Sequence, residues 1–201
     1  MMEQINNRKI IKGKRTLFKL KKTAKSLFSK KGYAKTSTED IVSEAKVTRG
    51  ALYHHFKGKK DLFRAVFDDV HVDIANEIIK QSRPEKSSWD RLLKGTYTFL
   101  NVCMEPEIQR IVLIDGPAVL GWQEWREIDT QRSVIFLKKI LKDLMMEQQI
   151  TGISLDATTH LISGATNELA LWIAQAKKPE QALEEARLTL RTMFEKLFLS
   201  E

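Results

Sequence analysis

The sequence predicts an all-α protein with a basic N-terminal module and a larger helical body. Apolar residues recur at spacings of three and four along the chain, which is the period of an amphipathic helix. No segment alternates apolar and polar residues as a half-buried strand does. Charge also divides the chain: residues 1–64 carry 18 Lys and Arg against 5 Asp and Glu, whereas residues 65–201 carry 16 against 21. This asymmetry indicates a polyanion-binding module attached to a body with another task.

Composition narrows the class of protein. A length of 201 residues is enough for one or two domains with a substantial core. The one cysteine, Cys103, excludes an intramolecular disulfide and suits a reducing compartment. No run of about 18 apolar residues is present to span a membrane, and the polar, basic N-terminus does not resemble a secretory signal. We therefore expect a cytoplasmic protein.

The first segments are an arm and a helix. Residues 1–14 are polar and basic and show no core pattern, so we expect a flexible arm. Between residues 15 and 31 one helical stripe is apolar, and its members are Leu17, Leu20, Ala24, Leu27 and Phe28. Gly32 follows at the position where a glycine commonly ends a helix.

Two short helices joined by a tight turn are expected next. Ser37 with Asp40 three residues later matches a capping box, and Thr48 matches an N-cap. The apolar residues of both helices can share one small core: Ile41, Val42, Ala45, Val47, Ala51, Leu52 and Phe56. The second helix is then free to enter a major groove. Residues 15–62 are therefore interpreted as a three-helix DNA-binding helix-turn-helix domain.

The body, residues 63–201, reads as a series of further helices that bind a ligand and dimerise. A fourth helix of about five turns begins near Leu62, and a fifth closes before Pro106. The other expected helices cover 122–149, about 155–176 and 180–199. Breaks are expected at Ser82-Arg83-Pro84, Asp115-Gly116-Pro117, Thr151-Gly152 and Lys177-Lys178-Pro179.

Residues between 24 and 62 carry a specific resemblance. They agree in order and spacing, without gaps, and are Ala24, Leu27, Phe28, Gly32, Tyr33, Thr36, Ser37, Ile41, Ala45, Val47, Thr48, Gly50, Leu52, Tyr53, His55, Phe56, Lys59 and Leu62. This pattern resembles the tetracycline-repressor (TetR) family of bacterial transcription regulators. It covers roughly residues 15–65, and Lys57-Gly58 departs from the proline and serine often found there. The resemblance implies nine or more helices, a homodimer joined through two C-terminal helices, and a ligand pocket in the variable body.

Ten residues are candidates for DNA contact: Thr36, Ser37, Thr38, Thr48, Arg49, Gly50, Tyr53, His54, His55 and Lys59. The Arg49 guanidinium can bond a guanine or a phosphate, although it could also be a solvated helix-end charge. Gly50 allows close backbone approach. Tyr53 and His54 share its exposed face, Tyr53 for a phosphate or thymine and His54 for a base edge or phosphate.

The remaining candidates lie beside this face. His55 is turned further away, where it packs against the first helix or supports the phosphate side. Lys59 opens the fourth helix, where the positive helix end and the ammonium together favour a phosphate. The hydroxyls of residues 36–38 are expected to cap a helix and also to donate to phosphates. Histidines 54, 55 and 71 do not indicate a metal site, because adjacent helical residues point about 100° apart and no Cys or carboxylate completes a set.

An effector pocket is expected beside the Gly-Pro break of the body, since pockets combine apolar walls with few polar groups. The candidate wall residues are Phe99, Cys103, Trp122, Trp125 and Trp172. The same tryptophans could simply fill the core. No cluster of Arg or Lys surrounds these aromatics, whereas Asp115, Glu124 and Glu168 are present. We therefore expect an apolar effector that is neutral or cationic.

Dimerisation is assigned to the last two helices, because small residues permit close helix approach. The candidates are Leu161, Gly164, Ala165, Glu168, Leu183, Ala186, Leu190 and Met193, and burial within one chain is the alternative.

These expectations favour a ligand-responsive repressor that binds a near-palindromic double-stranded DNA operator as a homodimer. No nucleotide-binding or hydrolase motif occurs, so neither an enzyme nor a cofactor is expected. The alternative is a structural or interaction protein that uses the same helix-turn-helix as a DNA anchor. A genome-wide binding map separates the two, because a regulator occupies few promoters and an anchor many dispersed sites.

Overall fold

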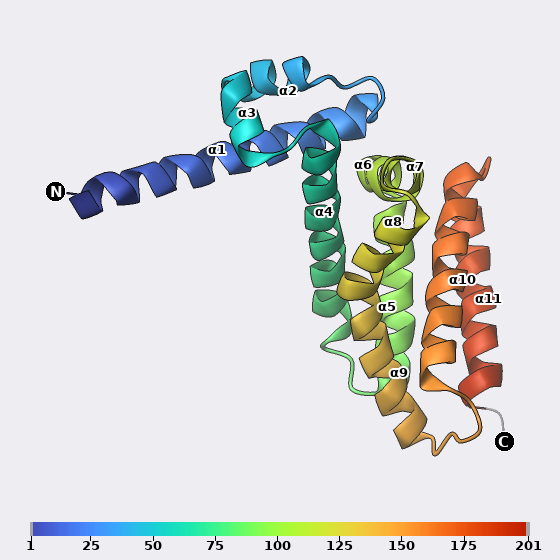
Figure 1. Ribbon diagram of the computed structural model, residues 1–201. Helices are drawn as coiled ribbons and strands as arrows, with labels where there is room; N and C mark the ends of the chain where they lie inside the picture. Colours follow the sequence, from blue (N-terminus) through green and yellow to red (C-terminus); the bar gives the residue numbers. More distant parts are fainter. Residues whose placement is uncertain (1, 200–201) are drawn as a thin grey trace.

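The structure, a computed structural model, describes residues 2–199 and is all-α over that range (Figure 1). Helices α1 (Met2–Lys31), α2 (Thr38–Ala45) and α3 (Arg49–His55) form the N-terminal domain, and α4 (Lys59–Ser82) runs from it into the body. The body continues through α5 (Ser88–Cys103), α6 (Pro106–Ile108), the π-helix η1 (Gln109–Asp115), α7 (Gly116–Leu120), α8 (Trp122–Asp129), the π-helix η2 (Thr130–Val134), α9 (Ile135–Glu147), α10 (Leu155–Gln175) and α11 (Pro179–Phe198).

Helix α1 begins much earlier than expected. The sequence predicted an arm over 1–14 and a helix from residue 15, whereas the helix already includes Met2. Residues 2–14 contain one glycine and no proline, so nothing in them breaks a helix. This end of α1 projects away from the rest of the molecule (Figure 1), and Ile10 and Ile11 on it are exposed, so no core pattern is needed there. Met1 of the predicted arm and residues 200–201 of the predicted body lie outside the described residues.

Local capping fixes α2 and α3 as predicted. The Ser37 hydroxyl accepts a hydrogen bond from the Asp40 N–H (3.0 Å), and the Ser37 N–H donates to the Asp40 carboxylate (2.9 Å). The Thr48 hydroxyl accepts from the Ala51 N–H (3.2 Å). Gly32 ends α1 with a φ of 79°, a conformation that favours glycine.

An aromatic cluster joins α1 to α4 and supports α3, the second helix of the helix-turn-helix. The Phe28 and Phe63 rings are fully buried and lie 5.2 Å apart, and Tyr33 lies 5.1 Å from Phe63. Leu52 of α3 is fully buried in the same core. Burial of a leucine or phenylalanine stabilises by roughly 1.5–3 kcal/mol, so this core fixes which side of α3 faces outward.

The expected break at Asp115-Gly116-Pro117 is wrong, because the chain stays helical through η1 into α7. In a π-helix each N–H bonds the carbonyl five residues earlier, and Pro117 has no N–H for the carbonyl of Val112. The indole N–H of Trp125 donates to that carbonyl instead (3.0 Å). A side chain therefore replaces the missing backbone donor, and the helix widens without ending.

Helices α5, α9, α10 and α11 run side by side as the main bundle of the body (Figure 1). Leu100, Leu141 and Phe194 are fully buried in it. No helix within residues 2–199 is long and apolar enough to cross a membrane.

Candidate DNA-binding face and effector cavity

The exposed side of α3 presents four of the candidates for DNA contact. Arg49, Gly50 and His54 are exposed, and Tyr53 keeps 46% of its surface accessible. A Cβ added at Gly50 would meet only the Thr48 hydroxyl, at 4.0 Å, so the backbone there is open to close approach. Contact between these residues and DNA stays a prediction.

Arg49 is held by two neighbours on this face. Its Nη1 lies 3.3 Å from the carboxylate of Glu39 on α2, and its guanidinium carbon lies 5.6 Å from the centre of the Tyr53 ring. The pKa of Glu39 is lowered by its own backbone N–H, by the Thr38 hydroxyl and by Arg49. Glu39 was not selected from the sequence, although an acidic residue one turn into the preceding helix was visible there. A phosphate or base must compete with this carboxylate for Arg49.

Thr36 is not available to DNA, which corrects the prediction. The residue is only 1% exposed, and its hydroxyl donates to the carbonyls of Gly32 (2.8 Å) and Leu27 (3.4 Å). It closes the end of α1, while Ser37 caps α2 and Thr38 donates to the Glu39 carboxylate (2.9 Å). Of the three hydroxyls, the one on Thr36 is therefore used to hold the end of α1.

Lys59 and His55 also turn inward. The Lys59 ammonium donates to the carbonyls of Tyr33 (3.0 Å) and Thr36 (2.9 Å) and lies 4.1 Å from the centre of the Tyr33 ring. Two of its three N–H groups are therefore used within the domain. A Cβ added at Gly13 would lie 4.0 Å from the His55 ring, so His55 packs beside α1. The Lys59 side chain thus has a structural role within the domain, and its predicted phosphate contact stays a prediction.

A seam that the sequence did not predict connects the N-terminal domain to the body. The Tyr33 N–H donates to the Asp115 carboxylate of η1 (2.8 Å), and Arg110 lies 3.6 Å from the same carboxylate. The Arg110 guanidinium fills the space beside Gly32, where an added Cβ would come within 2.3 Å of it. Asp115 was assigned to the surroundings of a pocket, whereas it holds the two domains together.

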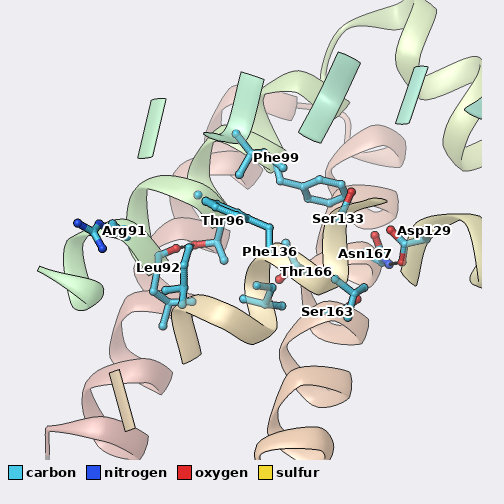
Figure 2. Close-up of a pocket in the computed structure, with 15 residues that line it drawn as sticks. Arg91, Leu92, Thr96, Phe99, Asp129, Ser133, Phe136, Ser163, Thr166 and Asn167 are labelled. Carbon is cyan, nitrogen blue, oxygen red and sulfur yellow. Dashed lines mark hydrogen bonds between the residues drawn. The ribbon is translucent and has the colours of Figure 1, made fainter. Parts of the chain in front are cut away.

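A cavity of about 60 Å³, the candidate effector site, lies among the helices of the body (Figure 2). Its lining comes from six elements and comprises Ile78 of α4; Arg91, Leu92, Gly95, Thr96 and Phe99 of α5; Asp129 at the end of α8; Ser133 and Val134 of η2; Phe136, Leu137 and Ile140 of α9; and Ser163, Thr166 and Asn167 of α10. Phe99 is the one predicted wall residue that lines it.

The other predicted wall residues lie elsewhere, which corrects the assignment. Cys103 is buried in the core away from this lining. Trp125 is buried with its N–H on the Val112 carbonyl, and Trp122 stacks on it with ring centres 5.1 Å apart. Trp122 is 69% exposed and Trp172 of α10 is 44% exposed. A tryptophan beside a helix break can thus support the backbone rather than a ligand.

The outer side of α10 carries an apolar stripe. Leu161 is 59% exposed, Gly164 and Glu168 are exposed, and Ala165 is half-buried. The candidates on α11 differ, because Leu183, Ala186 and Leu190 are buried within the chain and Met193 is half-buried. Their assignment to an interface is wrong for the buried three. Leu188 of α11 is exposed and was not selected from the sequence, and Trp172 of α10, selected there as a pocket wall, is exposed as well.

Comparison with known families agrees with this architecture. The family model described as "Bacterial regulatory proteins, tetR family" matches residues 20–66. The model described as "Tetracyclin repressor-like, C-terminal domain" matches residues 89–197. The chain belongs to the TetR family. It is a transcriptional regulator with a helix-turn-helix DNA-binding domain.

Relatives of this TetR-family chain span most of its length. The crystal structure of a TetR-family transcriptional regulator from Pectobacterium atrosepticum is 30% identical, with a TM-score of 0.81, and the match covers 94% of this chain and 97% of that one. The transposon Tn10 TetC protein of Escherichia coli is 27% identical over 165 residues, 82% of this chain and 83% of that protein. The regulator TtgR of Pseudomonas putida is 46% identical over 48 residues, 24% of this chain and 23% of that protein.

Proposed function

We propose that this TetR-family regulator is a ligand-responsive repressor that binds a near-palindromic operator as a homodimer. The observation that carries the proposal is the exposed face of α3, where Arg49, Gly50, Tyr53 and His54 share one side of a short capped helix. A recognition helix in the major groove needs side chains that reach base edges from a rigidly held backbone. The buried core under Leu52 supplies that rigidity.

A homodimer would place two such helices in successive major grooves. The exposed stripe of Leu161, Gly164 and Glu168 on α10, with Leu188 on α11, is the surface that we assign to the partner chain. Exposed apolar residues on adjacent helices favour a four-helix interface made from two copies. Two-fold symmetry of the protein then requires two-fold symmetry of the operator.

The effector would bind in the cavity of the body and release the operator. Ile78 of α4 lines that cavity, and α4 is the helix that enters the DNA-binding domain. A ligand that prefers a conformation with the two α3 helices misplaced would lower DNA affinity. The effector must in turn bind more weakly in the presence of operator, by the same factor.

The test is footprinting of the purified protein on DNA upstream of its own gene. We expect two protected half-sites separated by one helical turn of about 10 bp, or a multiple of it. Anisotropy titrations should give two chains per site, and log affinity should fall with log salt by about 0.9 per phosphate contact. Protection of a single half-site by one chain would contradict the dimer model, and many unrelated protected sites would contradict the repressor role.

A further inference from the structure

The effector cavity has one polar end and otherwise apolar walls. Figure 2 shows Asp129, Ser133 and Asn167 on one side of the cavity and Arg91 on the opposite side. The walls between them are mainly apolar and come from Ile78, Leu92, Phe99, Phe136, Leu137 and Ile140. A ligand that fills this space therefore meets hydrogen-bonding groups chiefly at the end formed by Asp129, Ser133 and Asn167.

The Ser133 hydroxyl at the polar end is buried and has no hydrogen-bond partner among the described residues. Other hydroxyls of the same cavity are satisfied: Thr96 donates to the Leu92 carbonyl (2.9 Å) and Thr166 to the Ile162 carbonyl (2.7 Å). A buried polar group without a partner costs about 1–3 kcal/mol, so such groups in native proteins commonly have a role. Ser133 is placed to bond a ligand.

Asp129 gives this end an acceptor whose charge is already balanced. Its carboxylate is almost fully buried and accepts from Arg126 Nη1 (3.0 Å) and from Asn167 Nδ2 (3.3 Å), both on the same oxygen. Burial raises the pKa of Asp129, and Arg126 opposes that rise. Arg126 already lies beside the carboxylate, and Arg91 is a second positive group at the other end of the cavity, so a ligand cation would be a third positive charge in a cavity with one carboxylate.

We propose that the cavity binds a small uncharged molecule with an apolar ring and one hydroxyl, directed at Asp129 and Ser133. This inference rests on the cavity being the effector site of the proposed function. A hydroxyl can donate to the carboxylate and at the same time accept the Ser133 O–H, whereas an ammonium has no acceptor and would leave that O–H unpaired. The sequence indicated an apolar ligand that is neutral or cationic. The cavity narrows this class to a neutral apolar alcohol or phenol.

The size of the cavity adds a condition on how the ligand enters. The cavity encloses about 60 Å³, whereas a cavity of about 150 Å³ accommodates benzene. An aromatic ring must therefore push a wall outward as it binds. The wall formed by η2 carries Ser133 and Val134, and π-helical turns are commonly local and functional. Binding and displacement of η2 are linked in this proposal.

The test uses three ring compounds of similar size with the full-length protein in the absence of DNA: phenol, toluene and benzylamine. Calorimetry and thermal unfolding report their affinities. In a purely apolar cavity toluene would bind more tightly, because the phenol hydroxyl would lose its hydration without a partner. We expect phenol to bind at least as tightly as toluene, and benzylamine, a cation at neutral pH, to bind most weakly.

Ser133→Ala is the decisive variant, since it removes a hydroxyl that has no hydrogen-bond partner within the described part of the chain and should fold normally. We expect it to weaken phenol binding roughly three- to tenfold, as loss of one hydrogen bond does, and to leave toluene binding unchanged. Ser82→Ala is the matched control, because this buried serine of α4 donates to the Ile78 carbonyl (2.7 Å) and does not line the cavity.

Three results would overturn the inference: tighter binding of toluene than phenol, tightest binding of benzylamine, or no stabilisation by any of the three. Equal loss of phenol and toluene affinity in Ser133→Ala would also do so. The effector role fails separately. If phenol binds through Ser133 but leaves operator affinity unchanged, the ligand chemistry stands and the ligand-responsive part of the proposed function does not.

Discussion

Arg132 of η2 and Asp68 of α4 form a two-point ion pair, with Nε–Oδ1 and Nη2–Oδ2 distances of 2.9 and 3.0 Å. Planar pairing of a guanidinium with a carboxylate fixes orientation as well as distance. Arg132 precedes Ser133, which lines the cavity, and α4 leads into the DNA-binding domain. The pair is therefore a rigid connection between the cavity wall and the helix that positions α3.

The first prediction is that Arg132→Gln uncouples the effector response from DNA binding. Operator affinity without effector should change little, because the pair is on the surface. The factor by which an effector lowers that affinity should fall by about threefold or more. Titrations with and without effector measure both quantities. Lys80→Gln is the control, since Lys80 pairs only with Glu77 within α4 (3.4 Å), and an undiminished response in Arg132→Gln would exclude this connection.

The second prediction concerns base reading by Arg49. Arg49→Ala should weaken operator binding by about five- to a hundredfold if the guanidinium bonds a guanine, and discrimination should relax at one base pair. Glu39→Gln should strengthen binding, because it removes a carboxylate that competes for the guanidinium (3.3 Å). Affinities on a panel of operator variants measure both effects, with exposed Arg83→Ala as the control. A uniform loss over the whole panel would assign Arg49 to a phosphate.

The third prediction is that a substitution at Gly164 breaks the dimer without unfolding the chain. An added side chain at Gly164 meets nothing within 4 Å inside the chain, and glycine weakens a helix interior by about 1 kcal/mol relative to alanine. Gly164→Leu should therefore retain the helical fold but wedge the partner chain away. Sedimentation should give about twice the 23.2 kDa chain mass for the wild type and for Gly164→Ala, and a monomer for Gly164→Leu. A dimeric Gly164→Leu would place the interface elsewhere.

The fourth prediction is an acid-sensitive stability due to His71. This side chain is 1% exposed and neither ring nitrogen has a partner among the described residues. Burial lowers the pKa of His71 from 6.5 to about 4, which Asp68 opposes and Arg132 favours. Between these two pH values the unfolded chain binds the extra proton, so stability is lost as the pH falls from about 6.5 to about 4.

The loss amounts to roughly 3 kcal/mol at most. His71→Leu removes the titrating group and the two unpaired nitrogens, so it should unfold at higher denaturant concentration and lose less stability in acid. Denaturant melts of both proteins at pH 7.5, 5.5 and 4.5 give the comparison. Parallel pH profiles of the two proteins would show that another group causes the acid loss.

Most helices could be predicted because their apolar period and caps are local properties. Ser37, Thr48 and Gly32 fix helix ends by bonds within a few residues, and the structure places all three as expected. The π-helical turns could not be foreseen, since a π-helix keeps an apolar period close to that of an α-helix. At η1 the sequence does contain one indication, a proline five residues after Val112. That proline can be interpreted only once the structure shows the Trp125 N–H bonded to the Val112 carbonyl.

The candidate sites were harder to predict than the fold. A small apolar residue at helical spacing is equally suited to an intrachain core or to a partner chain, so Leu190 and Leu161 look alike in sequence although one is buried and the other exposed. The cavity lining draws residues from six elements, and no local pattern links Ser133 to Asn167. The DNA-binding module could be predicted because a basic charge and a helix-turn-helix motif coincide in the same residues.

The seam of Gly32, Tyr33, Arg110 and Asp115 limits how this regulator can be rebuilt. A chimaera that joins a foreign DNA-binding domain near residue 62 would keep most of α4. The foreign domain would, however, place against η1 a surface that lacks the partners of Arg110 and Asp115. Any side chain at residue 32 would displace Arg110, and a different turn would leave the Asp115 carboxylate without its backbone N–H. A transplanted DNA-binding domain should therefore retain its operator specificity. Its response to the effector should be lost unless all four seam residues are transplanted with it.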